Sequence, residues 1–233
     1  FNGLWTSSFA IHGGRDLFIP ILAFKLFDTV NIAPVKYLFL LSIFIIKFLS
    51  IILSFQISKL TNLDKRYKII IFTLLSFFSL SISDYYNHAY GEIRDIFVLL
   101  FFILFFQIFL KKNSLLLSYL LSATTAISLF FHYDTGVYLN LIFCFFTLFL
   151  FISARTKEMM SIIFFLVLNY LFIYLYLGNE ETLSFVKQLL HIIQNIDKIH
   201  GLEYPRPFFS IGIEEHGSRA TRILVLILLT GII

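Results

Sequence analysis

The stretch SDYYNHAYGEIRDIFV (residues 83–98) largely decides how this chain folds, because it places several charged residues between two long apolar segments. A short polar link between segments that enter a bilayer has no room for a soluble domain. Its side chains therefore lie at a membrane surface or in a cavity just below that surface. The titratable residues concerned are Asp84, His88, Glu92, Arg94 and Asp95.

The composition is that of an integral membrane protein. Of 233 residues, 59% are hydrophobic and only 14% are charged, and the mean hydropathy is +0.89, whereas a soluble domain carries about 25% charged residues. The apolar residues form several runs separated by short charged links. This pattern predicts an all-α, polytopic bundle of transmembrane helices rather than a single anchor on a soluble body.

We expect about seven membrane spans. We predict an outer-face loop and an interfacial helix led by Pro20 within residues 1–34, and a six-span bundle within residues 35–178. We predict an outer loop at residues 179–218, where the first part has helical periodicity, and a truncated seventh span at residues 219–233. Because the chain starts without Met and ends inside an apolar run, we expect it to be a piece of a longer protein. The six spans are predicted at 35–57, 69–83, 96–110, 114–131, 138–153 and 161–178.

The distribution of charge predicts the orientation. Three links are rich in Lys and Arg and alternate with links that hold almost none, so the positive-inside rule assigns the basic links to the cytoplasm. Of the fourteen carboxylates, all but Asp64 and Glu158 then fall on the outer face, together with all six His. An outward-facing polar site in a bacterial inner membrane is the natural expectation. The basic residues are Lys59, Lys65, Arg66 and Lys68, then Lys111 and Lys112, then Arg155 and Lys157.

The first candidate site lies at the start of the third predicted span. Glu92 and Asp95 are three residues apart, so they share a helix face. The two carboxylates could hold a divalent cation, or Asp95 could act as a general base while Arg94 binds a phosphate. Capping of the helix dipole explains Glu92 equally well.

Two further polar clusters are predicted on the same outer face. In HYDTGVY (132–138), Asp134 and Gly136 suit a tight turn, and His132 with Asp134 could contact a substrate. In IHGGRD (11–16), two glycines precede Arg15 and Asp16 and would let backbone amides approach an anion, although the spacing is not that of a nucleotide-binding loop.

Two isolated residues, Lys47 and Cys144, lie within apolar runs. Lys47 lies in the middle of the first span, where it would face a polar cavity or extend toward the interface. Cys144 is the single cysteine, so neither a disulfide nor a cysteine-based metal site is expected.

The order of these features resembles that of the GT-C glycosyltransferases, multi-spanning membrane enzymes that use polyprenyl-phosphate sugars. Members of that family have a catalytic acid in the first outer loop, then a glycine-containing stretch, a proline-led interfacial helix and a basic-flanked span. The segments SSFAIHGGRDLFIPILAFKLFD, GEIRDIFVLLFF and HYDTGVY resemble this layout over about residues 7–153. The family's first-loop acid would fall at or before Phe1.

The resemblance implies inverting transfer of a sugar from a polyprenyl-phosphate donor to a glycan, lipid or protein acceptor at the outer face of the bilayer. It implies no required cofactor and no nucleic-acid partner; if a divalent cation takes part, Glu92 and Asp95 would hold it. The implied catalytic residues are Asp95 and Asp16, and the implied substrate-binding residues are Arg94, Glu92, His88, His132, Asp134 and Arg15.

Two other functions fit the same sequence. An O-antigen ligase or polymerase would use a long outer loop with Arg and His, for which this chain offers His200, Arg206, His216 and Arg219. A transporter would also show outward acids and a cation within a span, such as Lys47.

Overall fold

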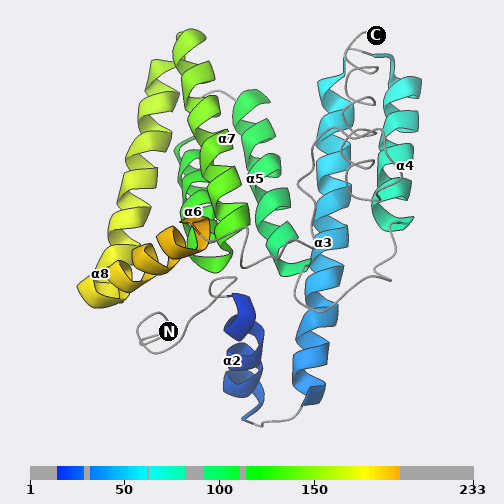
Figure 1. The fold of residues 1–233 in the computed structure, drawn as a ribbon. Helices are drawn as coiled ribbons and strands as arrows, with labels where there is room; N and C mark the ends of the chain where they lie inside the picture. The colour runs from blue at the N-terminus through cyan, green and yellow to red at the C-terminus, as the bar shows by residue number, and fades with distance from the viewer. Residues whose placement is uncertain (1–14, 29–31, 62, 82–91, 111–113, 195–233) are drawn as a thin grey trace, which may run out of the picture. The chain divides into compact units, whose positions relative to one another are not determined.

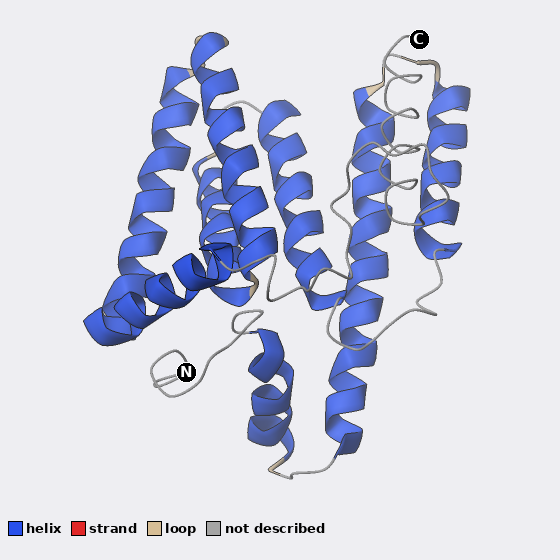
Figure 2. Ribbon diagram, in the orientation of Figure 1, coloured by secondary structure: helices blue, strands red, loops and turns tan. Residues whose placement is uncertain are grey.

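The computed structural model describes residues 15–28, 32–61, 63–81, 92–110 and 114–194, and helices are the only regular elements in these ranges (Figure 2). The prediction of an all-α chain is therefore confirmed for the described residues. The helices, labelled in Figure 1, are α2 (Arg15–Phe27), α3 (Ile32–Leu60), α4 (Lys65–Ser81), α5 (Glu92–Leu110), α6 (Leu115–Phe131), α7 (Tyr133–Ile152) and α8 (Thr156–Gln194).

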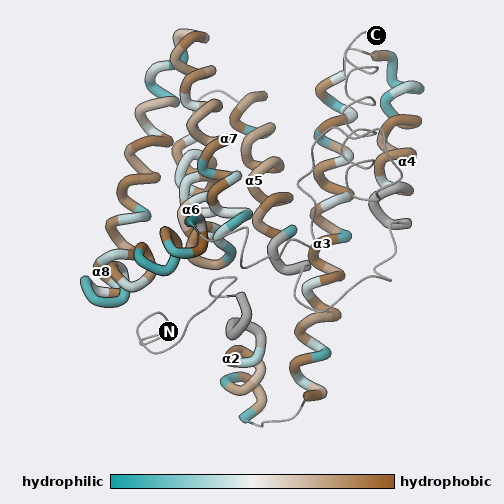
Figure 3. The backbone as a smooth tube through the Cα atoms, in the orientation of Figure 1, coloured by the Kyte–Doolittle hydropathy of each residue, from teal (hydrophilic) through white to brown (hydrophobic). Residues whose placement is uncertain are grey.

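Three of these helices are long and apolar enough to cross a membrane: α3, α7 and the segment Thr156–Ile192 of α8. Two shorter apolar helices, Asp95–Leu110 and Leu115–Phe131, accompany them. Figure 3 shows apolar residues along most of α5 and α7. These features support residence in a lipid bilayer. Seven spans remain a prediction, and the predicted span at 219–233 lies outside the described residues.

Several helix boundaries agree with the sequence predictions. Helix α5 begins at Glu92, so Glu92 and Asp95 do occupy the first turn of one helix. A break occurs at Gly178, whose backbone has φ 81° and ψ 173°, where the sixth span was predicted to end. Helix then continues to Gln194, which confirms the helical periodicity in the first part of the predicted outer loop.

Several helix starts differ from the predictions, including those of α4 at Lys65 and α8 at Thr156, which were predicted at 69 and 161. Helix α7 begins at Tyr133 rather than near 138, so Asp134 and Gly136 lie in its first turns and the prediction of a tight turn there was wrong. Helix α2 begins at Arg15, five residues before the proline that was expected to lead it. Pro20 therefore lies inside the helix, where its ring removes one backbone hydrogen bond.

The main apolar core is formed by α5, α6, α7 and the first part of α8, which lie side by side in Figure 1. Phe105 of α5 and Phe146 of α7 have ring centroids 4.4 Å apart, so aromatic contacts join these two helices along the core. The buried members are Phe101, Ile108, Leu121, Leu139, Phe143, Phe146, Leu150 and Ile162.

A second apolar contact joins α3 to this core. The buried Phe131, at the end of α6, packs against Val35, Leu38 and Phe39 at the start of α3 and against Ile96 and Phe97 at the start of α5. The first turn of α3 thus lies beside the last turn of α6. The last turn of α3, where the chain leads on to α4, therefore lies toward the end of the helices at which α6 begins. The alternating directions expected of a polytopic bundle are thus present.

Several serines of α3 satisfy their hydrogen bonds within the helix itself. In α3, the hydroxyl of Ser54 donates to the carbonyl of Ser50 at 2.8 Å, and that of Ser42 donates to the carbonyl of Phe39 at 2.7 Å. Such bonds to the preceding turn let serine lie in a hydrocarbon environment without a partner from another helix.

Helices α6 and α7 pack very closely near their junction. A Cβ atom at Gly136 would lie 2.8 Å from the carbonyl carbon of Ser128 and still closer to the backbone of Leu129. A backbone cannot move aside as a flexible side chain can. Only glycine therefore fits at this crossing, as is common where membrane helices approach through small residues.

We predict that Gly136→Ala destabilises the protein by about 3 kcal/mol, because the added methyl group forces two helix backbones apart. Reversible unfolding in mixed micelles, followed by circular dichroism, measures the change. Leu141→Ala on the exposed face of α7 serves as the control, since Leu141 is 52% exposed, and should cost about 0.5 kcal/mol. Equal stability of Gly136→Ala and the wild type would contradict the close crossing.

Candidate functional site at one end of the helices

Three elements meet at one end of the helices, which we call the acidic end: the start of α5, the α6–α7 junction and the part of α8 just after Gly178. The rings of Phe97 and Phe131 lie 4.9 Å apart and join the first two elements. Phe185 of α8 contacts Phe130 and Tyr133, with ring centroids 4.2 and 5.4 Å apart, and joins the third. Residues distant in sequence are thus brought together.

The last turn of α5 and the α7–α8 link (153–155) lie at the other end of the same helices, which we call the basic end. The Nη2 atom of Arg155 donates a hydrogen bond of 2.8 Å to the carbonyl of Ile108, in the last turn of α5. This contact places the α7–α8 link beside the end of α5. The predicted link with Lys111 and Lys112 lies outside the described residues, so the shared membrane face of the basic links stays a prediction.

His132 is the single residue between α6 and α7, and it is buried, with 2% of its surface exposed. Its backbone is extended, with φ −149° and ψ 109°, so it ends one helix and starts the next. Its Nδ1 accepts a hydrogen bond from the backbone N–H of Thr135 at 3.3 Å. Because Nδ1 acts as an acceptor, the neutral ring carries its proton on Nε2. The imidazole thus serves first as an N-cap of α7.

Two of the predicted carboxylates at this end, Asp95 and Asp134, have different surroundings. Asp95 is half-buried and directly precedes Ile96, which packs on Phe131. Asp134 is exposed in the first turn of α7, where its charge complements the helix dipole. Of these two carboxylates, Asp95 is therefore the one that the fold partly shields from solvent.

Glu181 is a further carboxylate at this end, and the sequence analysis did not single it out. It is 7% exposed, whereas its neighbour Glu180 is exposed. Glu181 lies one helical turn before Phe185, so it shares the helix face that packs on Phe130 and Tyr133. The four-residue spacing from Glu181 to Phe185 was the available signal, but the broad label of outer loop obscured it.

A polar contact within the bundle was also missed. The hydroxyl of Tyr170 in α8 donates to Oδ1 of Asn140 in α7 at 2.7 Å. The amide of Asn140 in turn donates to the carbonyls of Gly136 at 2.8 Å and Thr125 at 3.4 Å. This network connects three helices below the junction and holds the start of α7 in position.

The remaining predicted residues are placed as follows. Glu92 and Arg94 lie in the first turn of α5, at the acidic end. Arg15 and Asp16 open α2, which contacts α3. Lys47 is half-buried within α3. His88 lies outside the described residues.

Within the part of the chain that the structure describes, no three His, Cys, Asp or Glu side chains come together in a way that could hold a metal ion. A cation at Glu92 and Asp95 therefore remains a prediction from the sequence. Comparisons with known proteins found no matching family model, no matching curated protein and no matching solved structure.

We predict that His132→Ala lowers the free energy of unfolding by about 1 kcal/mol, because the N-cap of α7 is lost. His132→Asn should stay within a few tenths of a kcal/mol of the wild type, since Asn is among the best N-cap residues. Unfolding in mixed micelles compares the two variants. If Asn destabilised the protein as much as Ala does, capping could not be the main role of this imidazole.

Proposed function

We propose that this chain is part of a membrane glycosyltransferase that transfers a sugar from a polyprenyl-phosphate donor at the acidic end of the helices. The observation that carries the proposal is the meeting of the Asp95 turn, the α6–α7 junction and the buried Glu181 at that end. Carboxylates beside apolar helices are costly to keep ionised, and such positions are commonly functional. The GT-C-like layout of the sequence supports the same reaction class.

In this proposal Asp95 is the general base. Its carboxylate removes the proton from the acceptor hydroxyl, and the resulting oxygen attacks the anomeric carbon of the donor sugar. The bond from that carbon to the phosphate oxygen breaks, and the lipid phosphate leaves with the electron pair. Arg94 in the same helical turn would neutralise the departing phosphate. Attack from the face opposite the leaving group inverts the configuration of the sugar.

The position of the acidic end suits a lipid-linked donor. The exposed faces of α5, α7 and α8 offer apolar contact for a polyprenyl chain, for example at Phe145 and Phe164, which are 71% and 62% exposed. The phosphate would then lie at the ends of the helices, near the carboxylates. A site at a membrane surface allows the acceptor to approach from water.

We predict that Asp95→Asn in the full-length protein lowers the release of polyprenyl phosphate by at least about 100-fold, the smallest effect usual for a general base. Polyprenyl-phosphate sugars extracted from the host membranes serve as donors, and mass spectrometry measures the freed lipid phosphate. Asp64→Asn is the matched control, because Asp64 is an exposed carboxylate in the α3–α4 link.

Asp64→Asn should keep the wild-type rate, and both variants should elute as the wild type does in size-exclusion chromatography. An unchanged rate for Asp95→Asn would remove this residue from the reaction. If the wild-type protein released no lipid phosphate but accumulated a solute in proteoliposome counterflow, the chain would be a transporter instead.

A further inference from the structure

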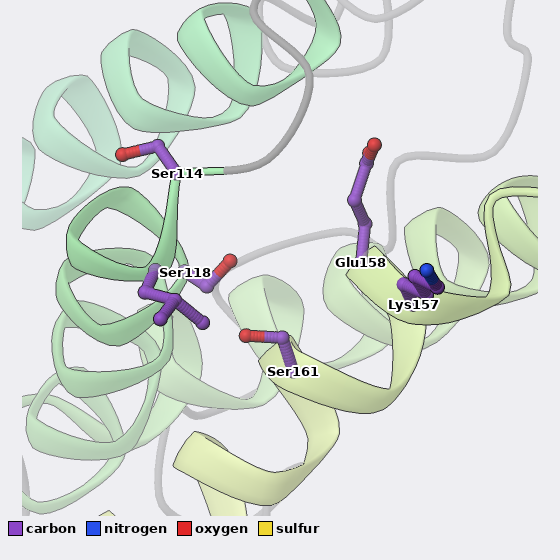
Figure 4. Close-up of a pocket in the computed structure, with 6 residues that line it drawn as sticks. Ser114, Ser118, Lys157, Glu158 and Ser161 are labelled. Carbon is purple, nitrogen blue, oxygen red and sulfur yellow. The ribbon is translucent and has the colours of Figure 1, made fainter.

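A pocket of about 290 Å³ lies at the basic end, between the first turns of α6 and α8 (Figure 4). It is separate from the site proposed for sugar transfer, because it lies at the other end of the same helices. The residues that line it are Ser114, Leu115, Ser118, Lys157, Glu158 and Ser161.

Two serine hydroxyls face the interior of this pocket. Figure 4 shows the hydroxyl groups of Ser118 and Ser161 directed toward each other from the two helices. The Ser161 oxygen is shielded from solvent and makes no hydrogen bond. A buried hydroxyl without a partner is costly, and that cost is removed if a bound group supplies a hydrogen-bond acceptor.

The two helices present their N-termini to the pocket. Ser114 is the N-cap of α6, where its hydroxyl accepts from the N–H of Leu117 at 3.4 Å. Helix α8 starts at Thr156, directly before Lys157 and Glu158. The first N–H groups of a helix lack partners within it and carry a partial positive charge. Two such termini side by side favour an anion over a cation.

The side-chain charges at the pocket also favour an anion. Lys157 is exposed at the mouth of the pocket and contributes a positive charge. Glu158 would oppose an anion, but its carboxylate forms an ion pair with Arg155. In Figure 4 the Glu158 side chain extends away from Ser118 and Ser161. The negative charge of Glu158 is therefore compensated, and Lys157 makes the net charge of the side chains at the pocket positive.

We propose that this pocket binds a phosphate group. Phosphate offers acceptor oxygens for both hydroxyls and for the backbone N–H groups of α6 and α8, and its charge complements Lys157. The volume accommodates a phosphate with a small part of a headgroup. The phosphate comes either from a membrane lipid or from free phosphate in solution, and the two sources share the same contacts. The proposal does not depend on the reaction proposed above.

Native mass spectrometry of the full-length protein tests it with three probes: phosphatidic acid, diacylglycerol with the same acyl chains, and inorganic phosphate. Phosphatidic acid and diacylglycerol differ only in the phosphate. We expect phosphatidic acid to bind more tightly, and Lys157→Ala to weaken its binding by about 10-fold, as loss of a charged hydrogen bond usually does. Lys157→Arg should restore binding.

Lys65→Ala is the matched control, since Lys65 is an exposed lysine at the start of another helix and does not line the pocket. Competition by inorganic phosphate would identify a soluble phosphate site, and binding of phosphatidic acid alone would identify a lipid site. Either result supports the proposal. Equal binding of diacylglycerol, or equal weakening by Lys65→Ala and Lys157→Ala, would overturn it.

Discussion

The close crossing of α6 and α7 at Gly136 is the constraint on which the rest of the arrangement depends. Because no side chain separates the two backbones there, a single residue, His132, is enough to connect the helices. The same crossing brings Asn140 within reach of the Thr125 carbonyl, and the hydroxyl of Tyr170 then ties α8 to α7. Lipid chains are as apolar as leucine, so close packing and hydrogen bonds of this kind hold membrane helices together.

The two ends of the helices consequently differ in chemistry. At the acidic end, aromatic contacts to Phe131 and Phe185 gather the turns that carry Asp95 and Glu181. At the basic end, Arg155 forms an ion pair with Glu158 and a hydrogen bond to the last turn of α5. Because the charge of Glu158 is compensated, the positive charge of Lys157 favours an anion there. In the two proposals, a carboxylate acts on the acceptor hydroxyl at one end, and a lysine binds a phosphate group at the other. The separation follows directly from the alternating directions of the helices.

Features that depend on local sequence were predicted well. The start of α5 at Glu92 and the break at Gly178 follow from an acid before an apolar run and from a glycine after one. The start of α7 was misplaced because Asp134 and Gly136 resemble a turn locally, whereas the structure needs a residue without Cβ to pass Leu129. The burial of Glu181 was missed although its four-residue spacing from Phe185 places both on one helix face, and that face packs against Phe130 and Tyr133 while Glu180 is exposed.

The assignment of the acidic end to the outer face is tested most directly by labelling cysteines in intact cells. The background is Cys144→Ser, because Cys144 is exposed in α7. A membrane-impermeant maleimide should label Asp134→Cys in intact cells, and should label Lys157→Cys only after permeabilisation. Labelling of Lys157→Cys in intact cells, with Asp134→Cys protected until permeabilisation, would contradict the orientation and with it the proposed outward-facing site.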